Sequence, residues 1–135
     1  MVSDVIRNKI EIVERCVLRI VEVYDETPEN LKDFTKQDSI VLNLQRAIEA
    51  CIDLAMHLVS TEKLGLPQSS RDAFELLRDH KYLHEELFLK MTAMVGFRNI
   101  AVHTYQKLDT EILQAIVDLH LDDFREFLQV AQAWA

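Results

Sequence analysis

The chain has 135 residues, of which 49% are apolar and 28% are charged, a balance that suits one folded domain rather than a disordered segment. It contains only two glycines and two prolines, so few tight turns are encoded and an all-β fold is disfavoured. The formal charge of −8 argues against a broad basic surface that binds nucleic acid by neutralising phosphates. Any contact with RNA must therefore be confined to a small positive region of the surface.

The N-terminal residues form neither a secretion signal nor a membrane anchor, because charges such as Asp4 and Arg7 interrupt the apolar residues. No apolar run elsewhere approaches the length that spans a bilayer. Cys16 and Cys51 fall among apolar helical positions, and two lone cysteines do not make a disulfide framework, so we expect buried thiols. These features predict a cytoplasmic protein with one domain over residues 1–135 and no membrane segment.

The first helix is predicted by apolar residues that recur at steps of three and four from Val2 to Tyr24. It should end near Asp25, because the residue before Pro28 is pushed out of the helical region. The polar linker that follows has room for a single helical turn over residues 30–34.

A second, long helix is predicted to start at Thr35, which is followed by Asp38 in a pattern close to a capping box. Two neighbouring apolar stripes run along it, so its apolar arc is wide and we place it at the centre of the fold, packed on two sides. It should stop within residues 63–67, where Gly65 offers a left-handed cap and Pro67 cannot continue the helix.

A short third helix follows, with Ser69 or Ser70 as its cap and an end near His80. The next helical pattern starts at about Leu83 and presents an apolar face. Continuing that face by one more turn leads to Arg98.

The last helix is predicted to begin after the cap residue Asp109 and to reach almost to Ala135. The complete pattern is all-α, with about five helices and no strand candidate. Because the connections are short, an antiparallel up-and-down bundle is the simplest arrangement.

Arg98, Asn99, His103 and Tyr105 place four polar side chains in one short segment between two helical patterns. Arginine can bind phosphate through two parallel hydrogen bonds, and histidine is the side chain whose pKa lies closest to neutrality. Since Arg98 continues an apolar face, it should have a carboxylate neighbour or face a cleft that receives an anion. An ion-paired arginine at a helix end and an ordinary surface or core histidine are the structural alternatives.

On one unbroken helix, the five-residue separation of Arg98 and His103 would turn their side chains about 140° apart. A helix break between them would let both side chains face one cleft. We therefore predict that the helix ends after Arg98 and that His103 turns back beside it.

Two histidine-containing patterns have spacings that can bind a metal. Glu49, Asp53 and His57 repeat every four residues on the central helix, but an arginine lies one turn earlier and an ion-paired or partner-facing stripe is the better interpretation. His80 and His84 straddle a helix junction and lack a third ligand. We predict no metal site and no cofactor.

Three sequence blocks are similar to the HEPN ribonuclease superfamily and, within it, to the HepT toxins of bacterial and archaeal MNT–HepT toxin–antitoxin pairs. The blocks are NLQRAIEA at residues 43–50, LGLP with SRDAF at residues 64–67 and 70–74, and MVGFRNIAVHTY at residues 94–105. The pattern of an arginine, a polar residue and a histidine is weak alone, but these blocks in this order are specific and span nearly the whole chain.

The resemblance implies a metal-independent endoribonuclease that works as a homodimer, with the motifs of both protomers lining one cleft. In that role His103 would act as general base or acid on the ribose and leaving oxygens, and Arg98 would stabilise the charge on the phosphate. Asn99 would orient the reacting groups. It also implies that a nucleotidyltransferase antitoxin attaches adenylate to Tyr105, which silences the toxin by placing charge and bulk where RNA binds.

A second function of a different class is compatible with the same residues. A small helical subunit can supply a substrate platform to a minimal nucleotidyltransferase, without catalysing anything itself. In that hypothesis Arg98 serves only as an anion anchor.

Overall fold

The computed structural model describes residues 4–103 and 110–134, with the backbone alone for residues 100–103. The described elements in chain order are α1 (Asp4–Tyr24), a 3₁₀ helix η1 (Pro28–Lys32), α2 (Phe34–Thr61), α3 (Ser70–Asp79), α4 (Glu85–His103), α5 (Thr110–Leu119) and α6 (Leu121–Gln132). No strand occurs in these ranges, and the predicted all-α fold is confirmed.

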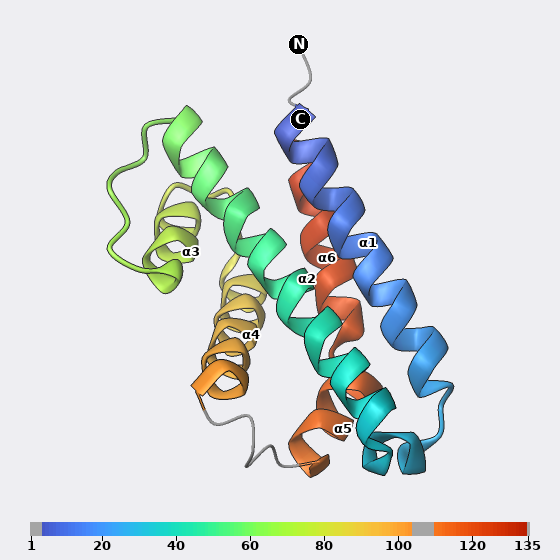
Figure 1. Cartoon of the computed structure of the whole chain (residues 1–135). Helices are drawn as coiled ribbons and strands as arrows, with labels where there is room; N and C mark the ends of the chain where they lie inside the picture. Colours follow the sequence, from blue (N-terminus) through green and yellow to red (C-terminus); the bar gives the residue numbers. More distant parts are fainter. Residues whose placement is uncertain (1–3, 104–109, 135) are drawn as a thin grey trace.

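The long helices form an up-and-down bundle with α2 at its centre (Figure 1). Helices α1 and α2 run antiparallel along each other, α6 packs behind them, and α3 and α4 cover another side of α2. The buried residues of α2 occupy a wide arc, because this helix contacts α1, α3, α4 and α6. The predicted central position of this helix is therefore confirmed.

The C-terminus of α1 is closed by side chains from the segments that follow it. Asn30 Nδ2 donates to the carbonyl oxygens of Tyr24 at 2.8 Å and of Val23 at 3.3 Å, which satisfies groups that a helix end leaves open. The Tyr24 hydroxyl donates to Asp118 Oδ1 at 2.7 Å and ties α1 to α5. Burial, reinforced by this hydrogen bond, raises the pKa of Tyr24 to about 12.

The two ends of α2 differ in detail from the prediction. Its cap is Asp33, which accepts from the Lys36 amide at 3.1 Å, and not Thr35, because a cap must precede the first helical residue. At the other end Lys63, and not Gly65, takes the left-handed conformation that stops the helix, with φ of 54°. The amide of Leu64 then donates to the carbonyl of Val59 at 3.0 Å, which completes a Schellman motif.

The predicted last helix is two helices, α5 and α6, which meet at His120. His120 has φ of −120° and ψ of 0°, and its ring Nδ1 lies 3.0 Å from Asp123 Oδ2 in the first turn of α6. The prediction of one helix was wrong because the apolar spacing continues across the junction. The two segments differ in their main neighbours, because α5 packs mostly against η1, and α6 packs mostly against α1 and α4.

The buried side chains form one hydrophobic cluster drawn from all the α-helices and η1. Cys16 and Cys51 both belong to it, as predicted, and burial raises the pKa of the Cys51 thiol. Within the described ranges, no helix is long and apolar enough to cross a membrane.

Candidate functional site

Arg98 is held on two sides by residues of other helices. It extends the apolar face of α4, and its side chain is only 22% exposed. Its Nη1 donates to Glu49 Oε1 on α2 at 2.7 Å, and its Nη2 lies 3.4 Å from Ser70 Oγ at the start of α3. The sequence required a carboxylate neighbour or an anion cleft here, and Glu49 is the carboxylate.

The third nitrogen of the Arg98 guanidinium has a different environment. Its Nε is buried, and no acceptor for it is found in the part of the chain that the structure describes. A buried donor without an acceptor costs roughly 1–3 kcal/mol. The ion pair with Glu49 therefore fixes Arg98 in place without giving every donor of its guanidinium an acceptor among the described residues.

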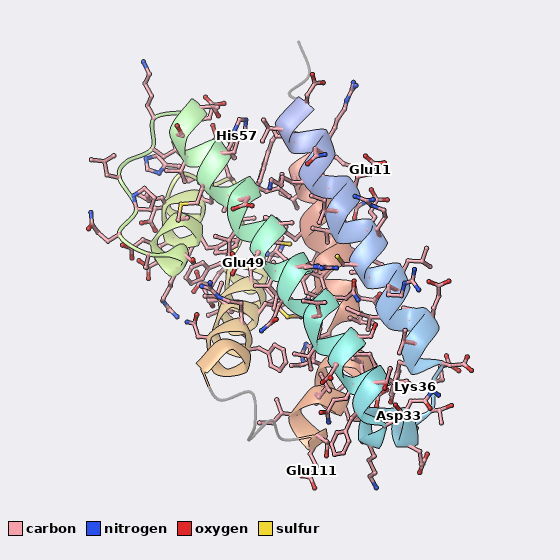
Figure 2. All side chains as sticks on the ribbon, in the orientation of Figure 1. Glu11, Asp33, Lys36, Glu49, His57 and Glu111 are labelled. Carbon is pink, nitrogen blue, oxygen red and sulfur yellow. The ribbon has the colours of Figure 1, made fainter. Side chains whose placement is uncertain are left out.

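Glu49 lies on a stripe of α2 that stays accessible, and Figure 2 shows it on the side of α2 near α4. The next residue of this stripe, Asp53, pairs with Lys9 of α1 at 2.9 Å. Each carboxylate has its own cationic partner, so the ion-pair interpretation of Glu49 and Asp53 is confirmed. Among the described residues, no three metal-binding side chains gather at one point.

His80 and His84 also make separate contacts. His80 Nδ1 lies 2.9 Å from the Leu76 carbonyl oxygen, whereas His84 accepts from the Leu87 amide and faces Glu126 at 3.6 Å. The Nδ1 atom of His80 contacts the end of α3 and that of His84 contacts the start of α4, so they do not converge on a common ligand position.

The other three predicted site residues lie at the end of α4 and beyond it. Helix α4 continues through His103, so the predicted break after Arg98 is wrong: the backbone hydrogen-bond pattern persists to the last described residue of this segment. Asn99 is exposed. The side chain of His103, and Tyr105 as a whole, lie outside what the structure describes.

The continuous helix has a geometric consequence for two of the predicted site residues. The backbone positions of Arg98 and His103 on this helix are about 140° apart around its axis.

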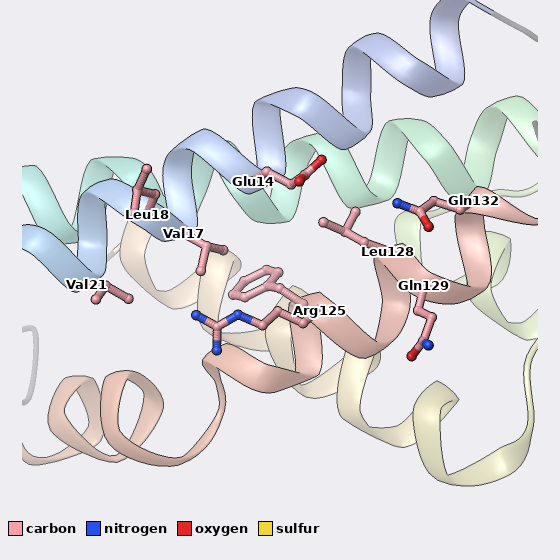
Figure 3. A pocket seen from close by; sticks show the side chains of 9 residues that line it. Glu14, Val17, Leu18, Val21, Arg125, Leu128, Gln129 and Gln132 are labelled. Atoms are coloured by element: carbon pink, nitrogen blue, oxygen red, sulfur yellow. The ribbon is translucent and has the colours of Figure 1, made fainter.

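A groove between α1 and α6 lies outside this region (Figure 3). It has a volume of about 430 Å³, and its charged side chains are Glu14 and Arg125, of which Arg125 already pairs with Asp122. None of its lining residues comes from α2, α3 or α4. It is therefore separate from the Arg98 site.

Comparison with known proteins places the chain in a family. Residues 6–131 match the family described as Ribonuclease HepT-like. The Shewanella oneidensis protein called mRNA nuclease HepT is 47% identical over 131 residues, which are 97% of this chain and 98% of that protein.

Solved structures agree with this match. A tri-AMPylated Shewanella oneidensis HEPN toxin in complex with MNT antitoxin superposes with a TM-score of 0.93 at 47% identity, covering 98% of this chain and 99% of that one. A toxin–antitoxin structure with AMP-PNP gives a TM-score of 0.91 at 46% identity, covering 96% and 99%.

The chain belongs to the HepT-like ribonuclease family. The resemblance drawn from its sequence blocks is thereby confirmed, and so is the expected enzyme class, a ribonuclease. The roles of individual site residues remain predictions.

The contact between Glu49 and Arg98 predicts unequal effects of two similar substitutions on RNA cleavage. Glu49→Gln removes the charge that fixes the guanidinium and should lower kcat about tenfold or more, because a hydrogen bond to a charged group contributes roughly 1.5–3 kcal/mol. Asp53→Asn is the matched control, since its carboxylate is also 49% exposed on α2 but pairs with Lys9. Equal kcat values for the two variants would contradict a role of Glu49 at the site.

Proposed function

We propose that this chain is a cytoplasmic endoribonuclease toxin, a single domain over residues 1–135 that cleaves RNA as a homodimer and is neutralised by a nucleotidyltransferase antitoxin. Membership of the HepT-like ribonuclease family supports the reaction class. A relative named as an mRNA nuclease, and a related HEPN toxin solved with its MNT antitoxin, support the toxin role and the kind of partner. The observation that carries the assignment to a site is the fixed guanidinium of Arg98.

In the proposed reaction His103 takes the proton of a ribose 2′-hydroxyl as this oxygen attacks the adjacent phosphorus. The bond from phosphorus to the 5′-oxygen of the next nucleotide breaks, and an imidazolium returns a proton to that leaving oxygen. Arg98 donates hydrogen bonds to the phosphate oxygens, on which negative charge builds up. Asn99 is exposed next to Arg98 and orients the substrate. No step of this scheme uses a metal.

Two considerations support a homodimer as the active form. The chain carries a net charge of −8, so a single protomer repels RNA, whereas two Arg98 side chains brought together create a local positive cleft. The backbone positions of Arg98 and His103 on the continuous α4 helix are also about 140° apart around its axis, and a second copy of α4 would bring another histidine to the side where Arg98 lies.

We also propose that the antitoxin transfers adenylate to Tyr105. A related toxin is described as tri-AMPylated, and Tyr105 lies two residues after the proposed catalytic histidine. A phosphodiester on this phenol adds negative charge and bulk beside the position of the RNA phosphate. Modification would therefore block substrate binding directly.

Cleavage of RNA in the presence of EDTA tests the proposed reaction. The wild-type chain should cleave RNA with unchanged rate when divalent metals are removed, and His103→Ala should abolish cleavage while circular dichroism and gel filtration stay the same. Full RNase activity in His103→Ala would refute the mechanism. No RNase activity in the wild type, together with nucleotide transfer to a small molecule only when the partner is added, would favour the non-catalytic substrate-binding subunit instead.

Intact mass spectrometry tests the proposed modification. Coexpression with the antitoxin should add one or more adenylates to the wild-type chain, and Tyr105→Phe should remain unmodified. Tyr24→Phe is the matched control, because Tyr24 is buried and hydrogen-bonded and should not be a substrate. Adenylate on Tyr105→Phe would assign the modification to another residue.

A further inference from the structure

A groove of about 610 Å³ between α1 and α2 gathers arginines on an otherwise acidic protein. Arg15 and Arg19 enter it from successive turns of α1, about 6 Å apart along the helix axis. Arg46 enters it from α2. We call this feature, lined by the three arginines together with the polar side chains of Ser39 and Asn43, the arginine groove.

The guanidinium groups of the arginine groove form few ion pairs with other described residues. Neither Arg15 nor Arg46 forms an ion pair with another described residue. Arg19 lies 3.9 Å from Glu22, and both side chains are more than half exposed, so this contact is weak. One carboxylate, Asp38, lines the groove, and it is not without a partner.

Arg15 and Arg46 both lie near the Cys16 thiol, which is buried between the two helices. Burial raises the pKa of the Cys16 thiol at the base of the groove, and the charges of Arg46 and Arg15 act on it in the opposite direction. Both cations are therefore close enough to influence the same buried atom from different helices. This convergence distinguishes the groove from a stripe of independent surface charges.

The arginine groove also adjoins the Arg98 site. Arg46 precedes Glu49 by three residues on α2, so their Cβ atoms are neighbours on the helix surface, about 5–6 Å apart. The carboxylate of Glu49 lies 2.7 Å from Arg98. An extended polyanion that reaches Arg98 can thus continue past Glu49 onto Arg46.

We propose that the arginine groove binds phosphates of single-stranded RNA next to the scissile bond. Arginine suits this task because its planar fork matches the geometry of phosphate oxygens and its charge is permanent. The inference rests on the proposed ribonuclease function and adds a substrate-binding surface to it. It also explains how a chain with a charge of −8 holds a polyanion outside its cleavage cleft.

Binding of a fluorescent 2′-O-methyl RNA oligonucleotide, which lacks the attacking hydroxyl, tests the arginine groove without cleavage. Measured by anisotropy between about 50 and 200 mM KCl, the variant Arg15→Ala/Arg46→Ala should bind about tenfold more weakly than the wild type at low salt. The slope of log K against log[KCl] should become shallower by about 1.4, since each neutralised phosphate of a single strand contributes about 0.7. Arg7→Ala is the matched control, because Arg7 is an exposed arginine of α1 that lies outside the groove and forms no ion pair with another described residue.

Unchanged affinity and slope in the double variant would overturn the proposal. Loss of antitoxin binding with intact oligonucleotide binding would also overturn it, because the groove would then be a protein-docking surface. These results are separable from a failure of the proposed function. If the wild type cleaves RNA while the double variant binds like Arg7→Ala, only the groove is refuted. If the wild type binds through the groove without cleaving RNA, only the nuclease is refuted.

Discussion

The ion pair between Arg98 and Glu49 is the interaction on which the rest of the site depends. It joins the end of α4 to the middle of the central helix, and Ser70 at the start of α3 approaches the same guanidinium. A cation that is only 22% exposed would be costly without such a partner. The pair therefore fixes the direction of Arg98 between α2, α3 and α4.

The acidic composition constrains how such a site can work on RNA. A protomer with a charge of −8 cannot attract a polyanion over its whole surface, so binding must depend on a few concentrated cations. In the proposed function Arg98 supplies one of them, and the three arginines of the arginine groove supply others. A homodimer would double these cations in one place.

Much of the fold was predictable because it follows from apolar spacing, but the helix ends were not. The stripes along α2 correctly placed it at the centre, whereas its cap was assigned to Thr35 although Asp33 stands one residue before the helix. The junction at His120 was missed because the apolar period runs through it, although α5 and α6 differ in their main packing neighbours. Local sequence does not contain that information.

The candidate site was predictable in part. Arg98 on an apolar face required a compensating charge, and the structure supplies Glu49, but the sequence could not choose this carboxylate because it lies 49 residues away. Its spacing with Asp53 instead indicated a stripe of ion pairs, which is also what the structure shows. The break expected after Arg98 is absent, and helix α4 continues through His103.

The continuous α4 helix motivates the central proposal, that the cleavage site is shared between two protomers, with Arg98 of one acting beside His103 of the other. The most direct test is RNA cleavage by a mixed dimer, in which an Arg98→Ala protomer and a differently tagged His103→Ala protomer are coexpressed and purified together. The mixed dimer retains one complete shared site, so cleavage should return although both parent homodimers are inactive. A mixed dimer as inactive as its parents would contradict the claim, and so would a wild-type chain that cleaves RNA as a monomer.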